Sequence, residues 1–301
     1  MRDCFDKTPS WLHIRDLKAL DTEVRTIVDL IHPDFDFTTY ERMFIDVVRL
    51  FIGDYPGYKA TNTDYHDLSH TLAVLLATAR LLHGLHIERG TLDKRSVTLG
   101  LYAALMHDVG YIQEIGDDEG SGAKYTLIHV ERGIVFMQQY FTEHGIPDED
   151  SLDCAAMLRC TDLNIAVSDL AFSTPSAMLV GLALGAADIL AQMADELYME
   201  KLPGLYREFR EAGILTYESE YDLMRETLNF HKIMRLRLQE DLKGVDRSMR
   251  AHFRARWRAD TDVYEDNICK NMQYLEHILE QHGPDYHVCL RRKRDRRPPF
   301  F

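Results

Sequence analysis

Two histidines spaced four residues apart carry the first chemical signal in this sequence. His66 and His70 stand in the segment YHDLSH at residues 65–70, ahead of an apolar run from Leu72 to Leu82. On a helix, positions i and i+4 share a face, so both imidazoles would point into the same space. Such a pair can chelate a metal, or one ring can bind metal while the other handles a proton. The alternative is two partly buried histidines with ordinary hydrogen bonds, which is the commoner case for an isolated pair.

A histidine and an aspartate stand side by side at His107-Asp108, at the end of the segment 96–109. This segment is apolar nearly all round, which predicts a buried helix. Aspartate is almost never fully buried unless it is paired, so Asp108 beside His107 indicates a nearby cation. A helix end at which Asp108 has already reached solvent explains the pair equally well.

Asp188 is the only charged residue between Ala177 and Ala194. The apolar segment 176–198 approaches the length of a membrane span, but its glycines, alanines and central aspartate favour a packed core helix. A buried ionised carboxylate is costly unless it is paired or metal-bound. An arginine or a helix N-terminus could pair with it. The metal interpretation is favoured because the histidines and Asp108 already indicate a site that needs another carboxylate.

The composition of the chain excludes several classes of protein. The chain has 301 residues, 46% of them apolar, which is enough for a sizeable core. Its formal net charge of −14 argues against binding nucleic acid through the whole surface. Five cysteines without a Cys-x-x-Cys motif argue against a disulfide framework and fit a reducing cytoplasm. The N-terminus does not resemble a signal peptide, so a cytoplasmic protein is expected.

Apolar spacing predicts helices along the whole chain and no strand, hence an all-α fold. Gly84 is expected to end the helix that starts near His66, and Gly244 to separate two long C-terminal helices that Trp257 and Tyr264 anchor. The acidic, glycine-rich segment 114–124 is either a mobile loop near the site or a solvated connector. The other expected helices are 14–30, 40–51, 127–141 and 152–158.

This pattern predicts four regions. Residues 1–60 form an N-terminal helical extension, 61–215 a metal-binding catalytic core, and 216–285 the C-terminal helices packed on that core. Residues 286–301 form a basic tail. A solvated tail is the default interpretation of the basic run at 291–297, and contact with an anion or partner is the weaker one.

The order of these motifs resembles the HD superfamily of metal-dependent phosphohydrolases. Residues 65–70 are similar to the Tyr-His-Asn-x-x-His signature of class I cyclic-nucleotide phosphodiesterases, and the 37 positions from His70 to His107 suit that family. Cys160-Thr161-Asp162-Leu163 resembles its Thr-Asp-Met segment. Ala186-Ala187-Asp188-Ile189 resembles its late Ala-Asp-Leu segment. The resemblance covers about residues 60–210 and implies a helical bundle of the HD or phosphodiesterase type.

The resemblance also implies a role for each residue. It assigns His70, His107, Asp108 and Asp188 to a first metal, with Asp108 bridging to a second metal. His66 would be the general acid that protonates the leaving oxygen.

Two departures from the phosphodiesterase pattern change the expected second metal and substrate. Tyr111 stands where the motif beginning at His107 has its next histidine. The form His-Asp-Val-Gly is closer to broader bacterial HD proteins, in some of which a later histidine followed by glycine ligates the second metal. His129, in the segment 127–133, resembles that ligand; the alternative is an ordinary histidine. No segment resembles the one that holds the purine-binding glutamine, so phosphoester chemistry is expected ahead of cyclic-nucleotide specificity.

The function implied is a metal-dependent phosphohydrolase acting on a phosphoester, a nucleotide or cyclic nucleotide, through a metal-activated hydroxide and a histidine acid. Two divalent ions are expected, from among Zn, Mn, Fe, Ni and Mg. The expected partner is a small phosphoester, neither membrane nor nucleic acid, and a homo-oligomer is compatible with the sequence. Two alternatives keep the metal: a catalytically degenerate HD module that regulates or senses a ligand, and a di-iron oxidase.

Overall fold

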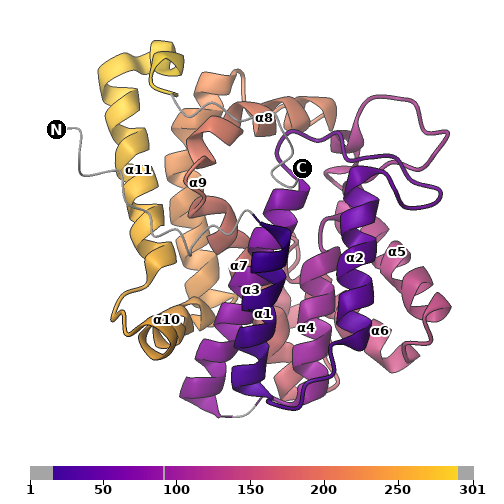
Figure 1. Cartoon of the computed structure of the whole chain (residues 1–301). Helices are drawn as coiled ribbons and strands as arrows, with labels where there is room; N and C mark the ends of the chain where they lie inside the picture. Colours follow the sequence, from indigo (N-terminus) through magenta and orange to yellow (C-terminus); the bar gives the residue numbers. More distant parts are fainter. Residues whose placement is uncertain (1–15, 91, 291–301) are drawn as a thin grey trace.

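The computed structural model describes residues 16–90 and 92–290, and it is built from α-helices (Figure 1). Within these two ranges the only extended pairing is an isolated antiparallel bridge between Tyr58 and Glu114. The all-α prediction is therefore confirmed. The predicted basic run at 291–297 lies outside the described residues.

Two long apolar helices, α3 (Leu68–Arg89) and α7 (Pro175–Met193), pack against each other at the centre. Each is long and apolar enough to cross a membrane by length and composition alone. Most of each helix is buried inside the protein, however, which is equally typical of the core helices of a soluble protein. Asp188 in α7 remains the only charge in its apolar stretch.

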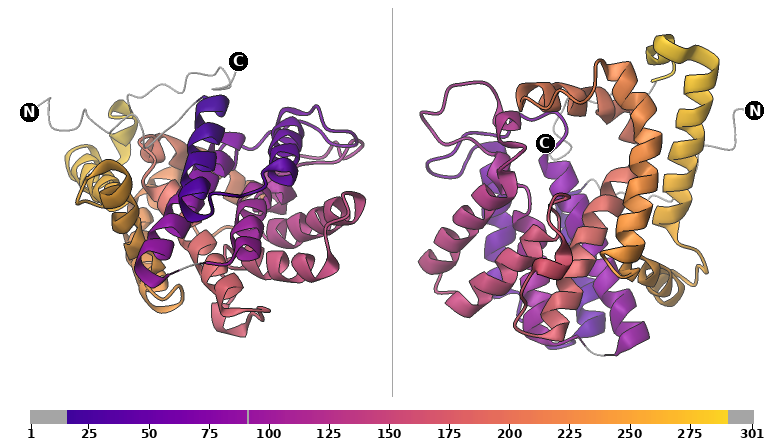
Figure 2. Two further views of the ribbon diagram at one scale, coloured as in Figure 1. Left: turned by 60° about the horizontal axis from the view of Figure 1, so that its bottom comes forward. Right: turned by 180° about the vertical axis from the view of Figure 1, so that it is seen from behind.

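The remaining helices flank this pair on two sides (Figures 1 and 2). On one side lie α1 (Leu17–Ile31), α2 (Thr38–Ile52), α4 (Lys94–Met106), α5 (His129–Glu143) and α6 (Asp148–Arg159). On the other side lie α9 (Glu220–Glu240), α10 (Met249–Trp257) and α11 (Val263–His282), with α8 (Tyr198–Glu211) across one end. The α5 and α6 helices start within four residues of their expected positions.

The start of α3 differs from the prediction. Asp67 is the N-cap, and its side chain accepts a hydrogen bond from the backbone N–H of His70 at 2.9 Å. His66 therefore lies in the bend before the helix, and the expectation that both histidines share one helical face is wrong. An aspartate one residue before an apolar helix is a strong cap, which sets the first residue of α3 at Leu68.

Gly84 does not end α3, contrary to the prediction. The helix continues to Arg89, and a Cβ atom placed on Gly84 would lie 1.9 Å from the carbonyl oxygen of Ser248. The missing side chain thus lets the 3₁₀ turn η4 (Val245–Ser248) and α10 approach the helix backbone. Glycine marks a close contact here and not a helix end.

The C-terminal region contains three long segments where two were expected. Gly244, with φ +66°, lies between α9 and the helices that follow, as predicted, although α9 itself ends at Glu240. A second break follows at Arg258, with φ +54°, between α10 and α11. Tyr264 is buried and its hydroxyl accepts a hydrogen bond from Arg80 at 2.9 Å, so its anchoring role is confirmed. Trp257 is 37% exposed, so the same prediction for it is wrong.

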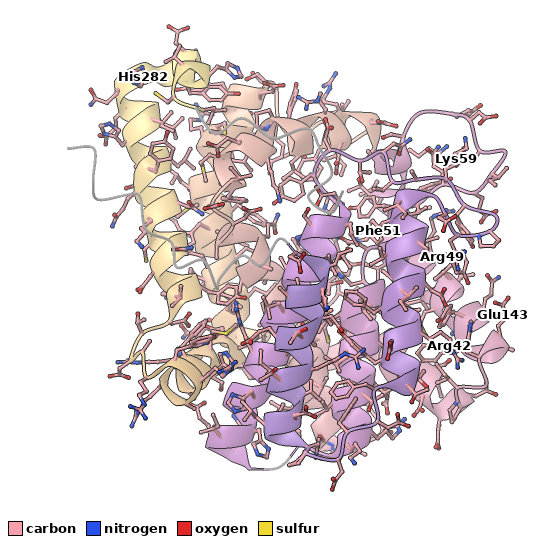
Figure 3. The ribbon with its side chains drawn as sticks, in the orientation of Figure 1. Arg42, Arg49, Phe51, Lys59, Glu143 and His282 are labelled. Carbon is pink, nitrogen blue, oxygen red and sulfur yellow. The ribbon has the colours of Figure 1, made fainter. Side chains whose placement is uncertain are left out.

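The acidic segment 114–124 is held by several contacts and not by packing of apolar residues. Lys59 reaches Asp118 at 2.5 Å, and the buried Gln113 donates to the backbone oxygens of Asp117 and Glu119 (Figure 3). At its far end, Ser121 donates through both its backbone N–H and its hydroxyl to Glu211 of α8. These bonds connect the segment to two other parts of the chain.

Candidate metal centre

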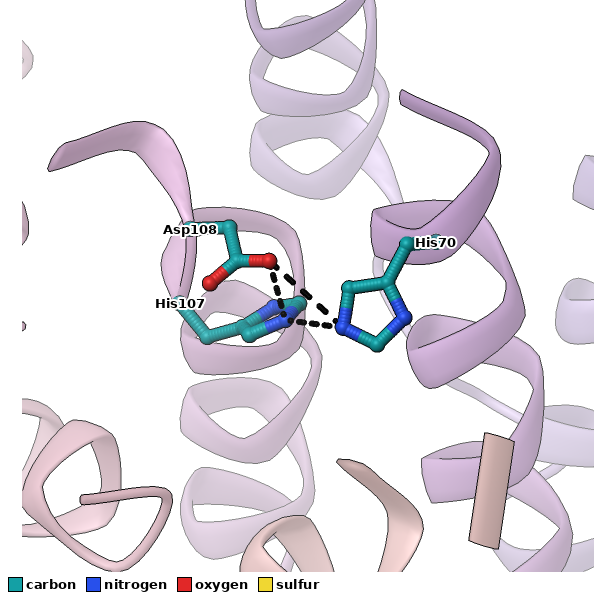
Figure 4. Close-up of side chains that lie close together, drawn as sticks. All are labelled: His70, His107 and Asp108. Atoms are coloured by element: carbon teal, nitrogen blue, oxygen red, sulfur yellow. Dashed lines mark hydrogen bonds and ion pairs between the residues drawn. The ribbon is translucent and has the colours of Figure 1, made fainter. Parts of the chain in front are cut away.

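Three of the predicted ligands meet where α3 and α4 pack side by side (Figure 4). His70 comes from the first turn of α3, and His107 is the C-cap of α4. Asp108 follows at once, at the start of the 3₁₀ turn η1 (Val109–Tyr111). All three side chains are buried, and among the described residues they form a group whose ligand atoms could hold a metal ion.

The ligand atoms of these residues converge on one point. His70 Nε2 lies 3.4 Å from His107 Nε2 and 3.5 Å from Asp108 Oδ2, and His107 Nε2 lies 3.2 Å from the same Asp108 oxygen. Asp188 adds its Oδ1 at 3.1 Å from His70 Nε2 and 3.9 Å from His107 Nε2. Ligand atoms that each lie about 2.1 Å from one ion are separated by about 3.0–3.4 Å, so the spacings among His70, His107 and Asp108 suit a single cation. Asp188 is close to that spacing from His70 but lies farther from His107.

The hydrogen bonds of His107 prepare its free nitrogen to act as a ligand. Its Nδ1 lies 2.9 Å from the backbone oxygen of Ala104, and a carbonyl can only accept. The proton of the neutral ring is therefore on Nδ1, and Nε2 presents a lone pair to Asp108. Two acceptors that face each other in a buried site need a proton or a metal between them.

Asp108 supplies a second reason to expect a cation. Its Oδ2 atom is buried and has no hydrogen-bond partner among the described residues. A buried carboxylate oxygen without a partner costs free energy, and a bound cation would remove that cost. This oxygen therefore fits a metal-binding interpretation. The donor set of two imidazoles and two carboxylates fits a divalent ion such as Zn, Mn, Fe or Ni.

The charged residues of the candidate centre shift one another's pKa values. Burial lowers the pKa of His107, but Asp108 and then Asp188 outweigh burial and raise that pKa to about 9. Burial raises the pKa of Asp108, and His107, His66 and His70 together hold it well below its usual range. A proton is therefore drawn to the position that a cation would take.

Asp188 lies less deep than the sequence suggested. Its side chain is 22% exposed, so the expectation of full burial is wrong, although its place among the other ligands is as predicted. Thr161 and Asp162, which resemble the Thr-Asp-Met segment, do not reach the ligand group. Arg237 instead binds the backbone oxygens of Cys160 and Asp162, and a Cβ atom on Gly185 would lie 2.6 Å from the Cys160 oxygen. This segment therefore supports α7 one turn before Asp188.

His129 faces the other oxygen of Asp108. Its Nε2 lies 3.8 Å from Asp108 Oδ1, and its Nδ1 donates to the backbone oxygen of Thr126 at 2.7 Å. The free Nε2 again presents a lone pair, because the carbonyl fixes the tautomer. Burial lowers the pKa of His129, which keeps the ring neutral. Asp108 thus turns one oxygen toward each of two places where a cation would find ligands.

His66 is held apart from these ligands by a residue that the sequence did not reveal. Its Nδ1 lies 2.6 Å from the carboxylate of Glu208 in α8, which is 3% exposed and also accepts from the backbone N–H of Tyr65. Burial lowers the pKa of His66, but the hydrogen bond and charge of Glu208 raise it overall. Glu208 carries no motif, and nearby Glu211 looks equivalent in sequence.

Tyr111 contacts both His66 and His129. Its ring stacks on His66 with centroids 4.3 Å apart and planes at 11°, and on His129 at 4.4 Å and 23°, and the two histidine rings lie 6.3 Å from each other. The residue is 2% exposed. Where the resembled motif has another histidine, this chain therefore has an aromatic ring that packs on two imidazoles.

Comparison with known proteins gives one match. Residues 117–248 are similar to a family described as Npun_R2479-like, a description that states no activity. The matched region contains His129, Asp188 and Glu208, whereas His66, His70 and the His107-Asp108 pair precede it. No curated protein matches the chain.

Proposed function

We propose that this protein is a metal-dependent phosphohydrolase of the HD type. The observation that carries the proposal is the convergence of three buried ligand atoms, from His70, His107 and Asp108, with the partly exposed Asp188 carboxylate 3.1 Å from His70 Nε2. A protonatable histidine, His66, stands next to them without joining them. Phosphoester hydrolysis needs both a cation and a proton donor.

The chain would hold the metal through residues from four elements. His70, His107, Asp108 Oδ2 and Asp188 would bind one ion, and Asp108 Oδ1 with His129 would provide part of a second position. Bound divalent metal would supply an activated water and neutralise the charge of a phosphoryl group. The carbonyls of Ala104 and Thr126 keep His107 and His129 in the tautomer that presents Nε2.

His66 would deliver the proton to the leaving oxygen. Glu208 accepts from Nδ1, which leaves Nε2–H as the available donor, and the pKa that Glu208 raises favours the protonated ring. The side chain is 16% exposed, so a ligand entering from solvent can reach it. Tyr111 holds the ring plane from one face.

Elemental analysis of the purified protein, followed by a screen of phosphoesters, tests this proposal. We expect one to two divalent ions per chain and hydrolysis of at least one nucleotide, cyclic nucleotide or nitrophenyl phosphoester. A chelator should lower the melting temperature, because binding only to the folded state stabilises by about 2.7 kcal/mol at 100 times the Kd. Bound metal with no hydrolysis of any of these esters would overturn the assignment in favour of a sensing module. An oxo-bridged di-iron spectrum would indicate an oxidase.

A further inference from the structure

Arginines are concentrated in one short stretch of this acidic chain. Residues 247–259 contain five arginines and neither aspartate nor glutamate, although the whole chain has a net charge of −14. The stretch comprises the end of η4, all of α10 and the turn after it. Its arginines are Arg247, Arg250, Arg254, Arg256 and Arg258.

Two of these arginines lie one turn apart on α10, and a third lies at its C-terminal end. Arg250 and Arg254 are exposed on the helix and Arg258 is the exposed C-cap, with φ +54°, whereas Met249 and Phe253 are buried. Four residues of helix rise about 6 Å. Positive charges therefore recur along this part of the surface, an arrangement that suits the repeated phosphates of a nucleic-acid strand.

Most of this charge is not neutralised by the protein. Arg247, Arg254 and Arg258 have no carboxylate within 4.0 Å among residues 16–90 and 92–290. Arg250 forms an exposed pair with Asp260 at 3.1 Å, which a phosphate could replace. Arg256 differs, since it pairs with Glu23 and lies 4.5 Å from the ring centroid of Trp257.

A hollow of about 350 Å³ continues the basic surface onto α9. Arg247 lines it together with Lys232, Arg235 and Gln239, and Leu236 contributes an apolar part of the wall. Its negative groups are Asp246, which lines it, and Glu265, which pairs with Arg235. The hollow is large enough for a base or a sugar.

We propose that this basic surface, formed by Lys232, Arg235, Arg247, Arg250, Arg254, Trp257 and Arg258, binds single-stranded nucleic acid. The arginines of α10 contact successive phosphates, the hollow accepts a base or sugar, and the exposed part of Trp257 offers a ring on which a base stacks. A flat anionic membrane fits less well, since it would not fill the hollow and Trp257 is the only large apolar side chain of α10 that is exposed.

The surface lies away from the candidate metal centre and does not depend on the proposed function. His70 is in the first turn of α3, whereas η4 and α10 contact that helix at Gly84. Fourteen residues of helix separate these positions by about 21 Å. The expectation that the chain does not bind nucleic acid was based on the net charge of the whole chain. Because that charge is unevenly distributed, the expectation does not apply to this end of the molecule.

Fluorescence anisotropy with a labelled 15-residue oligodeoxythymidylate tests the proposal on the full chain in the presence of a chelator. We expect binding that weakens steeply with salt. About four neutralised phosphates give a slope of log K against log salt near −3, which is about 60-fold between 50 and 200 mM. Arg254→Gln with Arg258→Gln should weaken binding at least tenfold at 50 mM salt and reduce the slope by about 1.4. Trp257→Leu should remove the quenching of tryptophan fluorescence that stacking causes.

The matched control is Arg42→Gln with Arg225→Gln, which removes two exposed arginines from α2 and the start of α9 (Figure 3). Equal weakening by the control pair would show non-specific attraction and overturn the proposal. Absence of binding at 50 mM salt would overturn it too. Sedimentation with phosphatidylserine vesicles that depends on Arg254 and Arg258, without binding to the oligonucleotide, would replace nucleic acid by a membrane surface.

Discussion

Buried histidines occur in pairs near both ends of α3, and the two pairs have opposite chemistry. At the N-terminal end, His70 meets His107 beside Asp108 and Asp188. Toward the C-terminal end, the Nδ1 of His83 lies 3.0 Å from the Nδ1 of His252, close to the buried Arg80. Helix geometry separates His70 from His83 by about 20 Å.

The surrounding charges, and not burial, explain the difference. Burial lowers the pKa of His107, His83 and His252 alike. Carboxylates overcome this effect and raise the pKa of His107 to about 9. Neighbouring cations reinforce it at the other pair, where the pKa falls to about 4 for His83 and about 2 for His252, next to Arg80 and Arg256. One pair attracts cations and the other repels them.

The largest expected effect is the loss of bound metal when a carboxylate beside the His70–His107 pair is removed. Asp188→Ala removes a ligand, so metal affinity should fall more than 100-fold, beyond the 10–100-fold typical for loss of an outer partner. His252→Gln is the matched control from the other pair, and it should leave metal content at the wild-type level. Elemental analysis after dialysis measures both. Full metal content in the Asp188 variant would show that the site is assigned wrongly.

The next largest effect distinguishes His66, the proposed proton donor, from the proposed metal ligands. His66→Ala should lower turnover by about 10² to 10⁴, since a general acid is lost, while bound metal stays near wild type. A nitrophenyl ester, whose leaving group needs less protonation, should lose less. Parallel assays with a nitrophenyl and an unactivated ester measure the difference. Metal loss equal to that of a His70→Ala variant would make His66 a ligand.

His129 should affect the number of ions and not the first site. His129→Ala removes the imidazole that faces Asp108 Oδ1, so the protein should bind about one ion fewer per chain while His70 and His107 retain the other. Titration of the metal-free protein, followed by calorimetry, gives the stoichiometry. An unchanged number of ions would return His129 to the status of an ordinary histidine.

Glu208 should have a smaller effect and a distinct pH signature. Glu208→Gln keeps a hydrogen-bond partner for His66 but removes the charge that raises its pKa. Activity that depends on protonated His66 is lost as pH rises through that pKa, so the alkaline limb of the pH–rate profile should move to lower pH. Turnover at neutral pH should fall by about tenfold. A profile that keeps its shape and position would contradict this role.

The smallest effect concerns stability in acid. His83 has a folded pKa of about 4, below the unfolded value of 6.5, so the unfolded chain takes up protons first as pH falls. This destabilisation develops between pH 6.5 and 4, and His252 extends it to lower pH. His252→Gln should reduce the drop in melting temperature between pH 7 and pH 5 by about 2–4 °C. An identical drop in wild type and variant would exclude the pair as the cause.

The sequence predicted the residues of the candidate metal centre better than it predicted their support. His70, His107 and Asp108 could be found because charged or imidazole side chains at the ends of apolar helices are rare and therefore informative. Asp188 could be found because it is the only charge in a long apolar stretch. Glu208 could not, since a buried glutamate in an amphipathic helix has the same local pattern as an exposed one until the fold brings α8 against the segment before α3.

Glycines show a second limit of sequence reasoning. Gly244 has a positive φ and lies in the break between α9 and η4, as expected from its effect on the backbone. Gly84 is also glycine within an apolar run, yet it lies inside α3 because another segment needs the space of its side chain. The backbone preference of glycine explains Gly244, whereas the role of Gly84 depends on Ser248, 164 positions away in the chain.

The loop at 114–124 and His66 are both held by one turn of α8. Ser121 is bound by Glu211, and His66 by Glu208, three residues earlier in α8. Surface loops normally tolerate changes in length, because little depends on where they end. Here an inserted residue between Gly116 and Ser121 would displace α8, the helix whose Glu208 binds His66. Insertional tolerance should therefore be low at this loop, which an insertion scan of turnover against melting temperature would reveal as lost rate without lost stability.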